Sequence, residues 1–285
     1  MGCEKVGFIN LEKRDVKNEK NETLLEEMHT KAEAVILKNK INAEEFRDLY
    51  GDVVDKDIAK AEKLKEKFGS GLDKNSRECK KYAEIMEAIF VDLVDKAEWM
   101  GKGTKAMNTA DYDDFENGID AIAEMTQEGG FKKHLGLAMD ATFANNLNGK
   151  FNGIKGEIVR GEMAKVKYFK SGNFKGQLSE VPHVIIGVSL GTIKELGEMW
   201  VKGDTEGLKN HPVQYQVLEE IIIQLETFEK YAEKYDKPEL AQVYRDNHTT
   251  LREIKAEKEK IQADSGWRDR SFYNIKDEMD KFLEV

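Results

Sequence analysis

The stretch that decides the fold reads LGLAMDATF and covers residues 135–143. Its first, third, fifth, seventh and ninth residues are apolar, a period of two that predicts a β-strand with these side chains on one face. Asp140 and Thr142 then lie together on the other face. A continuous apolar run at residues 183–188 predicts a second strand, buried on both sides.

Segments on either side of this stretch predict the rest of a compact unit. Residues 118–125 alternate weakly and predict the first strand of a hairpin, with 126–134 as its loop. Residues 148–163 can form a helix, although four glycines make it a poor one. Because a strand, a crossover helix and a strand imply a parallel pair, we expect the strands at 135–143 and 164–169 to be neighbours in one mixed sheet of four strands.

Long helices flank this unit. The strongest periodic pattern of the chain lies at residues 82–97, where apolar side chains recur at three-and-four spacing and predict one core-facing helix. A similar stripe at 213–228 predicts a second long helix, and the more polar stretch 239–262 a helix that leans on the domain or pairs with a partner helix. The helices predicted before the unit cover residues 22–38, 43–50 and 55–68.

The predicted fold is therefore α/β, a small mixed sheet in αββαββ order between long N-terminal and C-terminal helices. We divide the chain into a helical region at residues 1–72, the α/β core with its flanking helices at 73–235, and a helical extension at 236–285. The helices could also carry a homodimer contact.

Charge is unevenly distributed along the chain. The net charge of −10 counts against a protein that coats nucleic acid or an anionic membrane with its whole surface. Residues 132–175, however, include nine basic and three acidic side chains, about +6, so this segment predicts a basic face that could hold nucleic acid. The alternative is an ordinary solvated surface.

Two further patterns bear on location. No stretch of eighteen apolar residues occurs and the N-terminus lacks the apolar core of a signal peptide, so we expect a cytoplasmic protein without a membrane partner. Cys3 and Cys79 have no paired spacing, which argues against a disulfide framework and against a zinc site.

Two aspartates interrupt apolar strands. Asp120 lies in the first strand of the hairpin and Asp140 in the second. An ionised carboxylate in such a place is costly unless it is paired or bound to a cation, so the two acids predict a divalent-metal site. Oxygen ligands favour magnesium or manganese, and Glu87 or Glu84 on the 82–97 helix could add a third carboxylate. The alternative is that both acids face solvent at strand ends or cap turns.

The order of these features resembles the PD-(D/E)xK nuclease superfamily. In that layout a helix precedes a hairpin with Asp on its first strand and an acid-x-Lys on its second, and a helix and a strand follow. The runs that carry the resemblance here are residues 117–124 and 137–142. The region from Tyr112 to about Gln224 is also similar to proteins of small-genome bacteria. The resemblance implies a restriction-endonuclease-like core and magnesium-dependent cleavage of nucleic-acid phosphodiesters.

One position departs from the superfamily pattern. Thr142 stands where the motif lysine should be, and a hydroxyl cannot replace a cation that orients water and offsets phosphate charge. Lys165 and Lys167, on one face of the 164–169 strand, are the candidate replacements, although lysines on an edge strand also guard against aggregation. The catalytic candidates are thus Asp120, Asp140, Lys165 and Lys167, with Thr142 at the motif position. The alternative function is a catalytically inactive module that binds nucleic acid or protein.

A second enzyme motif is weaker. Residues 187–191, GVSLG, match the outline of a nucleophile elbow around Ser189. No acid and histidine are evidently placed as partners. A serine that caps the next helix explains the same residues.

Overall fold

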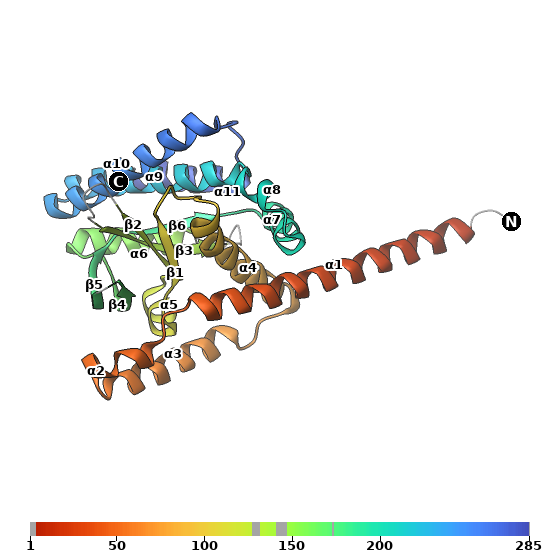
Figure 1. Ribbon diagram of the computed structural model, residues 1–285, viewed down its shortest axis with the longest axis horizontal. Coiled ribbons are helices and arrows are strands. Elements are labelled where there is room, and N and C mark those ends of the chain that lie inside the picture. The colour runs from red at the N-terminus through yellow and green to blue at the C-terminus, as the bar shows by residue number, and fades with distance from the viewer. Residues whose placement is uncertain (1–3, 127–131, 141–146, 173, 285) are drawn as a thin grey trace.

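The computed structural model describes residues 4–126, 132–140, 147–172 and 174–284, and it is a mixed α/β structure with helices around a small sheet (Figure 1). The strands are β1 (Lys105–Asn108), β2 (Ala121–Thr126), β3 (Lys132–Asp140), β4 (Ala164–Ser171), β5 (Phe174–Val181) and β6 (His183–Gly187). The helices are α1 (Glu4–Asn39), the 3₁₀ turn η1 (Ala43–Phe46), α2 (Arg47–Tyr50), α3 (Val53–Gly69), α4 (Lys74–Lys96), α5 (Asp111–Asn117), α6 (Leu147–Arg160), α7 (Leu190–Lys202), α8 (Thr205–Lys209), α9 (Val213–Lys234), α10 (Pro238–Ile261) and α11 (Arg270–Leu283).

The main sheet has four strands in the order β1-β2-β3-β6. The first three are antiparallel, and β6 runs parallel to β3 so that Gly187 lies opposite Asp140. The predicted hairpin of the 118–125 and 135–143 strands is confirmed as β2 and β3. Residues 127–131 of its loop, and residues 141–146 with Thr142, lie outside the described residues. The apolar run at 183–188 is the buried strand β6, as predicted.

The predicted position of the 164–169 strand is wrong. β4 pairs antiparallel with β5 in a separate two-stranded sheet, and the parallel neighbour of β3 is β6. The chain after β4 turns directly into β5, and this local antiparallel pairing needs no crossover. The connection from β3 to its parallel neighbour therefore contains both α6 and the β4–β5 hairpin. Val166 and Phe169 of this hairpin pack in one apolar cluster with Ile119, which precedes β2, and Ile122 of β2.

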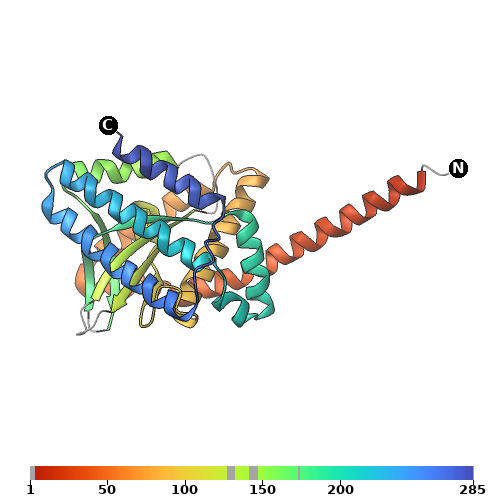
Figure 2. The ribbon, with the colours of Figure 1, turned by 90° about the horizontal axis from the view of Figure 1, so that it is seen from above.

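The core is built from helices of every part of the chain. α4 packs against β1 and β3, and its buried stripe from Tyr82 to Val94 follows the predicted spacing. α9 and α11 pack against β6. Leu251, Ile275 and Phe282 of the predicted C-terminal extension are buried in the same core cluster as the α4 stripe. The C-terminal helices therefore complete the main core (Figures 1 and 2).

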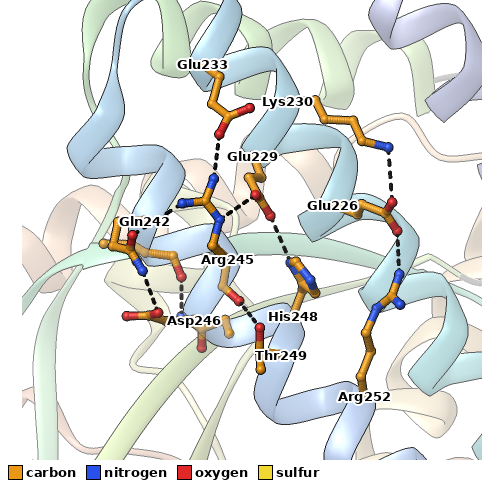
Figure 3. A network of polar contacts seen from close by, with 12 residues as sticks. Glu226, Glu229, Lys230, Glu233, Gln242, Arg245, Asp246, His248, Thr249 and Arg252 are labelled. Carbon is orange, nitrogen blue, oxygen red and sulfur yellow. Dashed lines mark hydrogen bonds and ion pairs between the residues drawn. The ribbon is translucent and has the colours of Figure 1, made fainter.

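Polar contacts fix α10 alongside α9 (Figure 3). The Arg245 guanidinium binds the carboxylates of Glu229, at 2.7 Å, and Glu233. Nδ1 of His248 lies 2.9 Å from the second oxygen of Glu229. These charged groups explain the polar composition of the 239–262 stretch, because one face of α10 binds α9 through ion pairs. Another face contributes Leu240, Tyr244 and Leu251 to the core.

The loop after α4 contains two glycines that allow a matched stability test. Gly101 and Gly103 both have positive φ, +84° and +79°, but only at Gly101 would an added Cβ meet another group, Cγ2 of Ile254 at 2.8 Å. We expect Gly103→Ala to lower the free energy of unfolding by about 1 kcal/mol through backbone strain. Gly101→Ala should cost about 2–4 kcal/mol, because the methyl group also displaces Ile254 on α10. Urea denaturation measures both, and equal losses would contradict the close approach of α10 to this loop.

Two further features concern helices. Figure 2 shows the N-terminal part of α1 extending away from the rest of the molecule, while its C-terminal part packs against α4 and α7. Among the helices in the described ranges, none combines the length and the apolar composition that a membrane crossing requires.

Candidate functional site: a cluster of carboxylates beside the sheet

Asp120 lies one residue before β2 and is bound to β3 through its backbone and its side chain. Its backbone N–H donates to the Leu137 carbonyl at 2.9 Å, and its Oδ2 accepts the Met139 N–H at 2.7 Å. Asp140, the last residue of β3, follows Met139 in the chain. The sequence predicted Asp120 inside the first strand of the hairpin; the structure places it one residue before that strand and beside the end of β3. The Asp140 side chain lies outside the described residues, so the predicted separation of the two carboxylates stays a prediction.

Two more acids lie next to Asp120. Burial, followed by the charge of Asp120 and a hydrogen bond shared with it, raises the pKa of Asp114 on α5 to about 7. Burial, followed by the charges of Asp120 and Asp114, raises the pKa of Glu87 on α4 well above its usual value. Three carboxylates from three elements thus act on one another. Glu87 is the α4 acid that the sequence analysis named, whereas Glu84 binds His29 at 2.6 Å.

Asn108, the last residue of β1, connects β1 to this cluster. Its Nδ2 donates to Oε1 of Glu87 at 2.5 Å, and the residue is only 1% exposed. Its Oδ1 is buried and has no hydrogen-bond partner among the residues that the structure describes. A buried acceptor without a partner costs about 1–3 kcal/mol, so a donor or a cation at this point would be stabilising.

Lys40 supplies positive charge to the cluster. It follows α1, forms a bridge with Asn108 in the parallel sense, and its ammonium binds the Asp111 carboxylate. Burial alone would lower the pKa of Lys40, but Asp111, Asp114 and Glu87 together raise it above its usual value. Lys40 therefore stays protonated beside three acids at neutral pH.

Lys40, Asp114 and Asn108 were not predicted as site residues. Lys40 lies between predicted helices about eighty residues before Asp120 in the chain. Asp114 lies on α5, a helix that was not predicted. The available signal for Asp114 was the density of acids in the DYDD run, residues 111–114, immediately before the Asp120 strand.

The donor set can be compared with the predicted metal. Carboxylates of Glu87, Asp114 and Asp120 and the free amide oxygen of Asn108 are oxygen ligands, which suit magnesium or manganese better than zinc. Within the described ranges, however, no three acidic, histidine or cysteine side chains are grouped closely enough to hold a metal ion. The chemistry of the residues fits the metal, and a complete ligand set would need a further group such as Asp140.

The two lysines predicted to replace the motif lysine lie on β4, which is not a neighbour of β3. The Lys167 ammonium binds the Asp57 carboxylate of α3 and lies 5.3–5.5 Å from the ring centroids of Tyr50, Tyr112 and Tyr168. Lys165 is exposed. The contacts of Lys167 thus connect β4 to the N-terminal helices.

Much of the predicted basic face is paired with acids of the same chain. Among the described contacts, four lysines of the 132–175 segment bind carboxylates. Three of these carboxylates belong to the N-terminal helices. These pairs are Lys132–Glu124, Lys167–Asp57, Lys170–Glu45 and Lys175–Asp48. The positive electrostatic potential around residues 132–175 is therefore weaker than the composition of this segment predicts.

The GVSLG run forms the junction of β6 and α7. Ser189 is the N-cap of α7 and accepts the Thr192 N–H at 3.3 Å, while its own N–H donates to Asp269 at 2.8 Å. The capping interpretation of Ser189 is therefore confirmed.

Stability should depend on pH through Asp114. Because its pKa is raised to about 7 in the folded protein, the folded state holds a proton that the unfolded state loses near pH 4, and stability falls as pH rises between these values. Asp114→Asn removes this penalty, since an amide can donate to Asp120 at any pH. Without divalent ions we expect the variant to be more stable than wild type at pH 8, by roughly 2–4 kcal/mol, and equal to it near pH 4.

Urea denaturation at the two pH values, in EDTA, measures this difference. Asp277→Asn, an exposed acid on α11, should change stability little at either pH. Equal stability of wild type and Asp114→Asn at pH 8 would contradict the raised pKa.

Comparison of the chain with protein families, with curated proteins and with solved structures finds no match.

Proposed function

We propose that the protein is a metal-dependent nuclease, or a protein derived from one, that acts on the phosphodiester bonds of nucleic acid. The observation that carries the proposal is the group of carboxylates Glu87, Asp114 and Asp120, in which burial and the charge of Asp120 raise the pKa values of Glu87 and Asp114. Such a group is costly in an empty state and is stabilised by a divalent cation. Perturbed carboxylates at one point of a fold are also typical of catalytic sites.

The order of elements supports the proposal. α4 carries Glu87, the β2–β3 hairpin has Asp120 at its start and Asp140 at its end, and α6 leads to β6, which is parallel to β3. This is the helix, hairpin, helix and strand order of the PD-(D/E)xK superfamily, with β1 and the β4–β5 hairpin as additions. A restriction-endonuclease-like core is therefore part of the proposal.

In the proposed reaction, water attacks phosphorus, the bond to one sugar oxygen breaks, and that oxygen takes up a proton to balance the one that the water loses. A magnesium ion held by Glu87, Asp114, Asp120 and Asp140 would polarise the phosphate and the attacking water. Lys40, protonated beside the acids, offsets the charge that develops on the phosphate oxygens and takes the role of the motif lysine that Thr142 lacks. Lys40 is preferred to Lys167 because Asp114 and Glu87 of the carboxylate cluster act on it, whereas the Lys167 ammonium is bound to Asp57 of α3.

A second candidate function is a binding module of the same fold without catalysis. It is favoured by Thr142 in the motif position and by the absence of a group of three metal ligands among the described side chains. In this case the acids would hold protons in place of a cation.

The test is cleavage of single-stranded and double-stranded DNA and RNA by purified protein with magnesium or manganese. We expect products with either metal and none in EDTA. Calcium serves as a control, since it takes the same oxygen ligands in a looser geometry and should support binding better than cleavage. Binding is measured in the same samples. If nucleic acid binds but none of the four substrates is cut with any divalent metal, the nuclease proposal fails and the binding module takes its place.

A further inference from the structure

A cavity adjoins the carboxylate cluster. It has a volume of about 360 Å³, lies between the end of α1, α3 and the start of α5, and shares Lys40 and Asp111 with the cluster. This volume lies within the roughly 300–1,000 Å³ of small-ligand sites. A molecule in the cavity would therefore have one end at the Lys40 ammonium.

The walls of the cavity are apolar and aromatic away from Lys40. Leu37, Ile41, Ile58 and Ala61 supply aliphatic surface and Tyr112 an aromatic ring. Leu37 is 79% exposed, an unusual position for a leucine on a helix that packs into the core. Asn42 and Glu62 line the same cavity and offer an amide and a carboxylate. The cavity thus combines apolar walls, a few hydrogen-bonding groups and, at one end, the ion pair of Lys40 with Asp111.

From this combination we infer that the cavity is a nucleotide subsite, in which the apolar walls hold a base and Lys40 holds the phosphate attached to its sugar. Bases have flat apolar faces, which bind to aromatic and aliphatic side chains, and polar edges, which bind amide and carboxylate groups. The nearby acids repel a phosphate, so its binding at Lys40 rests on the divalent cation of the proposed function. The base half of the site depends on the cavity alone.

The test uses two probes, adenosine and adenosine 5′-monophosphate, titrated into the full chain by calorimetry with magnesium or with EDTA. We expect adenosine to bind equally in both buffers. The monophosphate should bind about tenfold or more tightly than adenosine in magnesium, and Lys40→Gln should abolish this advantage while leaving adenosine unchanged.

Leu37→Glu tests the base half, because it places a charge at an exposed position of the apolar wall without disturbing the core. We expect it to weaken both probes by about tenfold or more. Leu49→Glu is the matched control, since Leu49 is 50% exposed and does not line the cavity; it should bind both probes as wild type does. Melting curves check that each variant is folded.

Two results would overturn the nucleotide subsite: no adenosine binding at millimolar concentration, or equal adenosine affinity of wild type and Leu37→Glu. These results are separable from those of the cleavage test. Adenosine binding without cleavage of any substrate overturns the nuclease alone. Cleavage by a wild-type protein that does not bind adenosine overturns the subsite alone.

Discussion

Asp120→Asn should lower the rate of magnesium-dependent nucleic-acid cleavage at least about a hundredfold. The amide keeps the shape of the side chain but loses the charge that would hold the cation, and metal-assisted charge stabilisation is worth several kcal/mol in the transition state. The amide oxygen can still accept the Met139 N–H, so the contact of Asp120 with β3 is retained. Single-turnover cleavage measures the rate, and circular dichroism checks the fold.

The control is Asp277→Asn, the same chemical change on an exposed part of α11, which should cut at the wild-type rate. Lys40→Ala and Lys165→Ala form a second matched pair. We expect a loss of about a hundredfold for Lys40 and little change for Lys165, which is exposed on a strand that does not adjoin β3. Cleavage by Asp120→Asn at the wild-type rate would show that Asp120 is not part of the site. Cleavage by Lys40→Ala at the wild-type rate would leave a lysine of β4 as the candidate for the role of the motif lysine.

The sequence predicted the parts of the fold in which local pattern and burial agree. The α4 stripe and the β2–β3 hairpin were found from periodicity, and the buried strand β6 was found from its continuous apolar run. The error concerned which strand lies beside β3. β6 is a continuous apolar run and β4 alternates with exposed lysine, so the stronger burial signal of β6 favoured it as the strand beside β3. We assumed that the crossover helix joins β3 to the next strand of the chain, which is β4. The β4–β5 hairpin instead lies within the crossover, so the parallel neighbour of β3 is β6.

Short elements were missed for a different reason. β1 has four residues, α5 has seven, and β5 has a single buried residue, so none has enough apolar side chains to show a period. Two of the missed elements carry Asn108 and Asp114. Asp120 and Glu87 could be named because each interrupts or borders an apolar pattern. The positions of Lys40, Asn108 and Asp114 depend on tertiary packing, which no local pattern records.

Asp113 should have the largest effect on stability among the acids of α5. Register shifts between Val166 and Phe169 interrupt the β4–β5 ladder. The N–H groups of Lys167 and Tyr168 instead donate to the Asp113 carboxylate, at 2.8 Å and 3.0 Å. Asp113 is fully buried, and burial raises its pKa although these two bonds oppose the shift. The Asp113 side chain therefore supplies acceptors for two N–H groups of β4 at the point where its pairing with β5 is irregular.

We expect Asp113→Ala to lower the free energy of unfolding by about 3–5 kcal/mol, because two backbone N–H groups lose their acceptor and each costs about 1–3 kcal/mol. Asp113→Asn keeps one acceptor oxygen and should cost less. Glu116→Ala is the control on the same helix, since its ion pair with Lys60 is partly exposed and should contribute less than about 1 kcal/mol. Urea denaturation compares the three variants. If Asp113→Ala costs no more than Glu116→Ala, then water or a rearranged β4 satisfies those N–H groups, and α5 does not hold the β4–β5 hairpin through Asp113.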